Sequence, residues 1–167
     1  MKLVSALGAL ALSVFMGSAL AQGAPRIGFV NTERILRDAT PAKAAQQKLE
    51  REFSKRDKEI QEMAANLKAM GERLDRDASV LSQSERQRRQ REFAELEKEF
   101  QRRQREFRED LNQRRNEELA AVVDQANRVI RQIAEQEKYD FILQEAVYAS
   151  PRVDITDKVL RALSSTK

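Results

Sequence analysis

The side chains that carry out most enzyme chemistry are missing from this chain. Its 167 residues include neither histidine nor cysteine. This removes the usual ligands for zinc and copper, the usual nucleophile–base pairs and the usual general base at neutral pH. Acidic residues are frequent but have helix-surface spacing, and no glycine-rich phosphate loop follows a predicted strand. The sequence therefore predicts a binding or structural protein, not an enzyme, with no metal ion and no cofactor.

Clustered cationic side chains are the chemistry that remains. Residues 86–115 hold eleven Lys or Arg against seven Asp or Glu, whereas residues 116–167 hold seven against nine. Exposed charge of this kind attracts anionic partners and speeds their encounter more than it tightens binding. The sequence pI of about 9.5 also fits a nucleic-acid-binding protein. However, no aromatic stacking platform or recognised motif accompanies the charge, so we expect no nucleic acid as partner.

Heptad repeats predict the long helices that carry these charges. Thr40 and Pro41 predict the start of the first helix, with the threonine hydroxyl as its N-cap and proline at the first helical position. Two columns of apolar residues then recur at seven-residue spacing, which is typical of a coiled-coil seam. The columns are Phe53, Ile60, Leu67, Leu74 and Leu81, and Leu49, Met63 and Met70.

A serine-rich segment, residues 77–85, divides the helical region. Ser82 and Glu85 have the spacing of a capping box, which predicts that a second helix begins here and that the chain folds back as an antiparallel hairpin. The alternative is one continuous helix over residues 42–137. In the second helix the apolar spacing passes from seven to eleven residues, as between Phe100 and Leu111, which predicts that the supercoil relaxes toward its end.

Both ends of the chain predict a small β-containing body. Residues 27–31, 139–143 and 147–150 are short apolar runs bounded by turn formers and are predicted strands. A last short helix is expected after residues 153–157. The apolar stripe over residues 122–133 is expected to pack on the sheet. Three short strands leave open edges and a small core, so we expect several copies of the chain to assemble through this region.

The first 21 residues have the pattern of a cleavable secretory signal. Lys2 precedes an apolar run, and small residues end in the triplet Ala19-Leu20-Ala21. A membrane anchor would need about 20 apolar residues, and this run is shorter. The sequence therefore predicts export with cleavage after Ala21.

The order of these features resembles the Skp (OmpH-like) family of periplasmic chaperones of Gram-negative bacteria. The resemblance is carried by the leader, the opening IGFVNTERIL, the charged helical hairpin and, above all, YDFILQEAVYASPRVDITDKVLRAL at positions 139–163. It covers essentially the whole chain after the leader. The opening strand and the tail are its diagnostic parts, because charged coiled coils look alike.

The resemblance implies a homotrimer with a small β-barrel-like body made from strands of three chains and three hairpins that project as tentacles around a cavity. The fold would be mainly α, of the α+β class, with the body at residues 22–40 and 135–167 and the hairpin at residues 41–134. The implied function is an ATP-independent periplasmic holdase that keeps unfolded outer-membrane β-barrel proteins soluble before membrane insertion. The alternative is an exported structural coiled-coil spacer or envelope-tethering protein without a client cavity.

Two groups of residues are candidate sites. The first group, candidate client contacts on the hairpin, is Phe53, Met63, Leu67 and Met70. Methionine adapts to varied partners, although these heptad positions equally suit a seam that only holds the hairpin together. The resemblance also implies a site for an anionic lipid or lipopolysaccharide phosphate, and its counterparts are Arg103 and Arg114. Gln113 stands where a further arginine is expected, and Arg115 could substitute for it.

Overall fold

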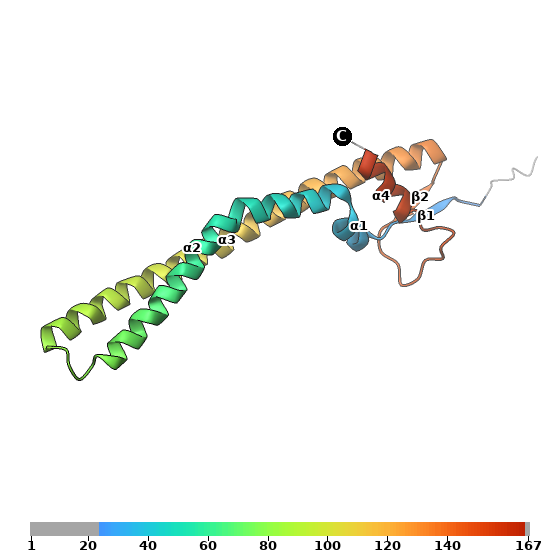
Figure 1. Cartoon of the computed structure of the whole chain (residues 1–167). Helices are drawn as coiled ribbons and strands as arrows, with labels where there is room; N and C mark the ends of the chain where they lie inside the picture. The colour runs from blue at the N-terminus through green and yellow to red at the C-terminus, as the bar shows by residue number, and fades with distance from the viewer. Residues whose placement is uncertain (1–23, 166–167) are drawn as a thin grey trace, which may run out of the picture.

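The structure is a long helical hairpin with a small body at one end (Figure 1). This computed structural model describes residues 24–165, so the expected signal peptide, residues 1–21, lies outside the described residues. The predicted mainly helical fold with a small β component is confirmed. The elements, in chain order, are β1 (Ile27–Phe29), α1 (Thr32–Asp38), α2 (Thr40–Arg76), α3 (Gln83–Glu137), β2 (Phe141–Leu143) and α4 (Thr156–Ser165).

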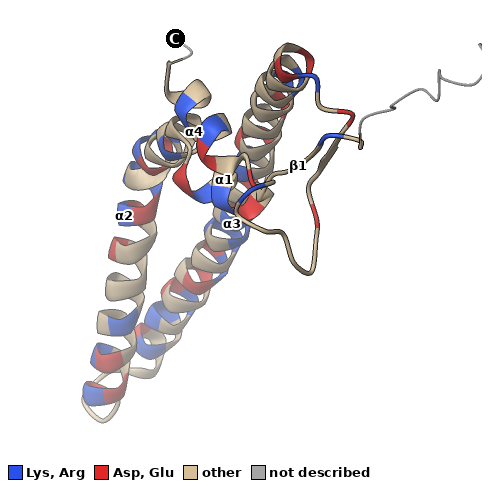
Figure 2. Ribbon diagram, turned by 90° about the vertical axis from the view of Figure 1, so that its right-hand side faces the viewer, with Lys and Arg blue, Asp and Glu red and all other residues tan. Residues whose placement is uncertain are grey.

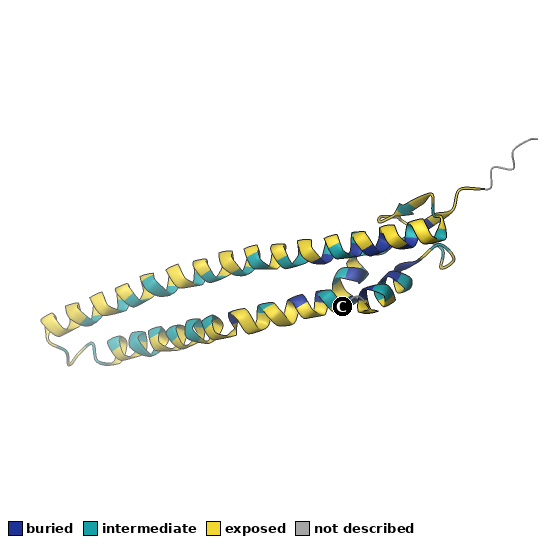
Figure 3. Cartoon of the chain, turned by 90° about the horizontal axis from the view of Figure 1, so that it is seen from above, coloured by how far each residue is buried: buried dark blue, intermediate teal, exposed yellow. Residues whose placement is uncertain are grey.

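The hairpin turn is built around a capping box. The Ser82 hydroxyl accepts a hydrogen bond from the backbone N–H of Glu85, and the Glu85 carboxylate accepts one from the backbone N–H of Ser82. These two bonds satisfy backbone donors that the first turn of α3 would otherwise leave without partners. The predicted turn is confirmed, and the alternative of one helix over residues 42–137 is wrong, because α2 and α3 lie side by side (Figure 3).

Helix α2 begins one residue earlier than its sequence suggests. Ala39 is both the C-cap of α1 and the N-cap of α2, and no side chain caps the first turn. The prediction that Thr40 is the N-cap is therefore wrong. The physical reason is the sharp junction between the two helices, in which a single extended residue joins them. Ala39 is only 1% exposed, so a small side chain occupies the junction.

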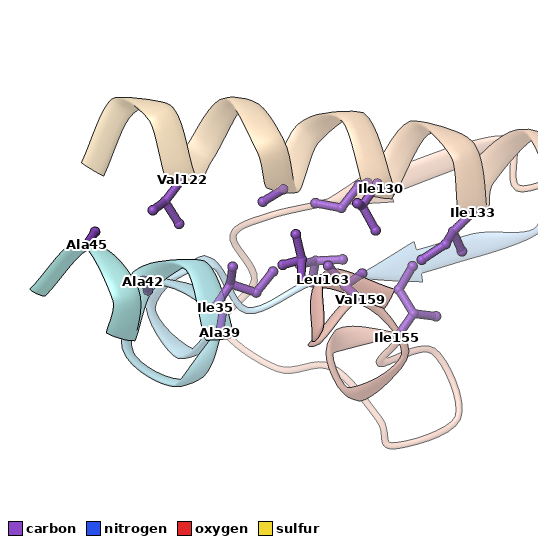
Figure 4. Close-up of a cluster of buried hydrophobic side chains, with 13 residues drawn as sticks. Ile35, Ala39, Ala42, Ala45, Val122, Ile130, Ile133, Ile155, Val159 and Leu163 are labelled. Atoms are coloured by element: carbon purple, nitrogen blue, oxygen red, sulfur yellow. The ribbon is translucent and has the colours of Figure 1, made fainter. Parts of the chain in front are cut away.

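The hydrophobic core lies in the body and at the base of the hairpin. Buried residues of α3, among them Val122 and Ile130, face Ile35 of α1 and Leu163 of α4 (Figure 4). We expected this stripe of α3 to pack on a sheet, but the sheet contributes only Ile142 of β2 at the margin of the cluster. Two strands of three residues each offer too little apolar surface, and the helices α1 and α4 supply it instead.

The sheet is smaller than the sequence suggests. Strands β1 and β2 pair in parallel, with Ile27 opposite Phe141. The third predicted strand, residues 147–150, is wrong, because that segment has no strand structure. Its place beside β1 is taken by the following residues, since Phe29 donates to the carbonyl of Val153 and accepts from the N–H of Ile155. The second edge of β1 is thereby filled.

Candidate functional site

The facing sides of α2 and α3 form an apolar seam whose burial falls toward the hairpin tip. Near the body, Phe53 is 6% exposed, and its ring meets that of Phe107 edge-on, with centroids 5.6 Å apart. Farther out, Met63, Leu67 and Met70 are only half-buried, and Figure 3 shows the same change along the hairpin. Of the four predicted client contacts, only Phe53 is enclosed, and the other three keep exposed surface along α2.

A ladder of ion pairs joins α2 to α3 along one flank of this seam. The rungs are Lys48–Glu118 at 2.6 Å, Glu52–Arg114 at 3.2 Å, Arg56–Asp110 at 2.8 Å and Glu59–Arg103 at 4.0 Å. The sign alternates from rung to rung on each helix, so a slip of the register by one rung would oppose like charges. Figure 2 shows both signs interspersed along the two helices. Exposed pairs contribute little individually to stability, and the ladder acts mainly on register.

Arg114 has the most carboxylate partners of the ladder cations. Its guanidinium donates to the carboxylates of Glu52, Glu117 and Glu118. These hydrogen bonds, that to Glu52 first, raise the pKa of Arg114 above its ordinary value. The pKa of the Glu118 carboxyl is lowered in turn, chiefly by the hydrogen bond from Lys48. The charge of Arg114 is therefore already balanced by the hairpin itself.

The three arginines predicted to bind an anionic lipid lie in different surroundings. Arg103 donates to Glu99 at 2.7 Å, and hydrogen bonds from Arg102 and then Arg103 lower the pKa of Glu99 to about 2. Arg103 and Arg114 both belong to the ladder. Arg115, in contrast, is exposed and has no ion-pair partner among residues 24–165. The structure thus brings two of the arginines to the flank that contacts α2 and leaves the third apart.

A groove opens on the other flank of the seam, close to the body. It has a volume of about 700 Å³, and it is lined by apolar residues of α2 and α3, by Leu36 of α1 and by four charged residues. The apolar residues that form its floor include Leu49, Phe53, Phe107 and Leu111, and the charged residues at its rim include Glu50, Asp57 and Arg115. Sequence reasoning identified the floor only as seam. The change of apolar spacing in α3 after Phe100 is the signal that could have located it, because the groove lies where the heptad pattern ends.

A second apolar surface lies on the body, around β2. Phe141 and Leu143 are exposed although they belong to a strand, and Val147 and Tyr148 in the following loop are more exposed still. In the described part of the chain, β2 pairs with β1 alone. Its outer edge therefore keeps backbone groups available for pairing.

Metal ligation has no support in the described region. Within residues 24–165, no group of three potential metal-ligating side chains occurs, and every buried side-chain nitrogen or oxygen has a hydrogen-bond partner. None of the helices in this region has the length and apolar content needed to cross a membrane.

Comparison with known proteins places this architecture in context. The model of the family described as "Outer membrane protein (OmpH-like)" matches residues 26–163. Two similar curated proteins are both called "Chaperone protein Skp". The protein from Vibrio cholerae is 26% identical over 161 residues, 95% of each chain. The protein from Photorhabdus luminescens is 30% identical over 146 residues, 86% of this chain and 88% of the relative.

Solved structures share the fold. The crystal structure of an OmpH-like protein from Caulobacter crescentus superposes with a TM-score of 0.72 and covers 91% of both chains. The sequence identity in that pair is 18%, so the likeness concerns the fold alone. The hairpin and body described above are thus an arrangement that a distantly related sequence also adopts.

Proposed function

The chain belongs to the OmpH-like family, and we propose that it is an ATP-independent holdase chaperone that keeps unfolded outer-membrane β-barrel proteins soluble in the periplasm. The observation that carries the proposal is the half-exposed apolar seam of a long charged hairpin. An unfolded β-barrel chain exposes alternating apolar residues and unpaired strand edges. Many weak contacts to such a hairpin would hold the client and still release it quickly, so no nucleotide is needed.

The client contacts that we propose are Phe53, Met63, Leu67 and Met70. Met63, Leu67 and Met70 keep exposed surface on α2, and flexible thioether side chains adapt to differently shaped partners. Phe53 supports the proposal differently, because it is enclosed by Phe107 but also lines the groove near the body. The four residues span much of α2, which suits a client without a fixed structure.

We also propose that the working form is a homotrimer that frames a client cavity. The exposed apolar side chains Phe141, Leu143, Val147 and Tyr148 support association through the body, because a contiguous exposed apolar patch is typical of an interface. The open edge of β2 offers a strand-pairing surface for another copy. Export of the chain after cleavage of residues 1–21 would deliver it to the periplasm.

An anionic lipid or lipopolysaccharide phosphate is a second proposed partner, through Arg103, Arg114 and Arg115. Arg115 is the best supported of the three, because it is exposed and without an ion pair in the described chain. Arg103 and Arg114 would have to exchange carboxylate partners for phosphate oxygens. Binding should therefore weaken as salt rises, since exposed charges are screened.

A holdase assay tests the proposed function directly. A urea-denatured outer-membrane β-barrel protein is diluted into buffer with residues 22–167 of this chain, and light scattering follows its aggregation. We expect suppressed scattering that is the same with and without ATP. An unrelated charged coiled coil at equal concentration is the control. Unchanged aggregation would exclude the chaperone and leave a structural spacer or envelope-tethering coiled coil as the alternative.

A further inference from the structure

The groove at the base of the hairpin has a one-sided construction. The ion-pair ladder, whose rungs include Lys48–Glu118 and Arg56–Asp110, closes one side of the groove, and Glu118 of this ladder also lines it. On the groove side, Leu49 and Leu111 keep exposed surface, and no ion pair joins the two helices across the opening within residues 24–165. A partner can therefore reach the apolar floor without breaking the contacts that hold the hairpin in register.

The length of the groove suits an extended peptide. Its lining on α2 extends from Ala42 to Asp57, which at 1.5 Å per residue is roughly 22 Å. An extended chain rises about 3.3 Å per residue, so roughly six or seven residues fit. Strands that cross the outer membrane are about 9–11 residues long and alternate apolar with polar side chains. One strand segment would thus direct three or four apolar side chains to the floor.

The rim of the groove carries unequal charge. Glu50 and Asp57 line it on α2, and each accepts a hydrogen bond from a glutamine of its own helix but has no ion pair in the described chain. Arg115 lines it on α3, also without an ion pair. Glu118 lines it on α3 as well, but its carboxylate is paired with Lys48 and Arg114. Two unpaired carboxylates against one guanidinium leave the rim acidic, which favours a cation on the polar side of an occupant.

We propose that this groove is a docking site for an extended strand segment of an unfolded client, with apolar side chains on the floor and a lysine or arginine against Glu50 and Asp57. The inference rests on the proposed function and adds a specific place and a charge preference to it. Leu49 and Leu111 act as floor contacts, and the two carboxylates select the cationic segment.

Designed peptides test the charge preference. One labelled nine-residue peptide alternates leucine with serine and lysine, and a second has glutamate in place of lysine. By fluorescence anisotropy the lysine peptide should bind roughly tenfold tighter, a difference that falls with added salt. Glu50→Gln with Asp57→Asn should abolish the difference, whereas the matched control pair Glu62→Gln with Asp75→Asn, outside the groove, should preserve it. Equal binding of the two peptides, or equal effects of the two variant pairs, would overturn the proposal.

Photocrosslinking tests the place with a real client. A benzophenone side chain is introduced at Ser54 in the groove lining or at Lys55, which is next to it but points away from the groove. Crosslinks to an unfolded β-barrel protein from position 54 and few from position 55 would support docking, and similar or absent yields at both would refute it. The unmodified chain is assayed for holdase activity in parallel. Holdase activity without a crosslink at position 54 would refute docking in the groove but not the proposed chaperone function. Loss of suppression in the holdase assay would refute the chaperone function itself.

Discussion

The ring of Phe53 meets the ring of Phe107 at an interplanar angle of 81°, and the guanidinium of Arg56 lies over both rings, 5.6 Å and 5.8 Å from their centroids. Arg56 also forms a rung of the ladder with Asp110. The apolar seam and the charged flank are therefore joined at one level of the hairpin. Beyond this level, toward the tip, no α2 residue is buried.

Replacing Phe53 with alanine should destabilise the hairpin strongly. The substitution removes a nearly buried ring and its edge-to-face contact, and a Phe→Ala change in a core costs about 3 kcal/mol or more. Urea unfolding followed by circular dichroism measures the loss. Val80→Ala is the control, because Val80 is 81% exposed in the turn and its truncation should have almost no effect. Equal midpoints for the two variants would contradict the packing described for Phe53.

Thr156→Val should destabilise the body, although the valine side chain has nearly the same shape as that of threonine. Thr156 is fully buried, and its hydroxyl oxygen accepts a hydrogen bond from the backbone N–H of Asn31 at 2.9 Å. Valine leaves that donor unsatisfied, at a cost of about 1–3 kcal/mol. Thermal unfolding measures the change, and Thr40→Val at an exposed position is the matched control. A Thr156→Val variant as stable as the parent would mean that water replaces the lost acceptor.

The carboxyl of Glu99 should titrate far below its usual range. Hydrogen bonds from Arg102 and then Arg103 lower its pKa to about 2. Because the folded-state pKa is depressed, this contribution to stability is complete above the unfolded value near 4.5 and is lost as the pH falls toward 2. Arg102→Gln should raise the pKa of Glu99 and so narrow the pH range over which this contribution to stability is lost. Side-chain NMR titration tests this, with Arg105→Gln as the control that leaves Glu99 unchanged.

Gly71→Ala should stabilise α2. Gly71 lies inside the helix, where glycine costs about 1 kcal/mol relative to alanine. A Cβ at this position would meet the Phe93 ring at 3.5 Å, an ordinary van der Waals contact. The urea midpoint should therefore rise, and Ala64→Gly at an exposed position of the same helix should lower it by a similar amount. A fall for Gly71→Ala would show that the helices cannot accommodate the methyl group beside Phe93.

The hairpin could be predicted from sequence because its signals are local or periodic. The capping box of Ser82 and Glu85 fixes the turn, and the heptads fix the faces that meet. The ion-pair ladder can also be predicted once the turn is located. Lys48 and Glu118 are equally far in sequence from Gln83, as are the next two rungs, so a known turn position yields the pairing.

The body and the groove depend on contacts that no local pattern encodes. Residues 147–150 have a strand-like composition, yet Val153 and Ile155 fill the edge of β1 first, through bonds to Phe29. The apolar stripe of α3 correctly predicted that this face of the helix is buried. It did not predict which elements cover it, since a helix or a sheet can cover an apolar face. The groove depends on the distance between α2 and α3. The apolar spacing indicates where the two helices separate but does not give that distance.

Arg26 bonds to Asp140 across 114 positions, and Asn31 bonds to Thr156 across 125. During synthesis from the N-terminus, β1 is made early, whereas Asp140 and Thr156, with which its flanking residues bond, are made near the end. The intervening turn is local and can form early, and by folding the long middle segment in half it shortens the effective loop that must close. Because Asn31 bonds to the first residue of α4, a chain that lacks α4 cannot close the body, and we expect its β1 segment to be open to proteolysis.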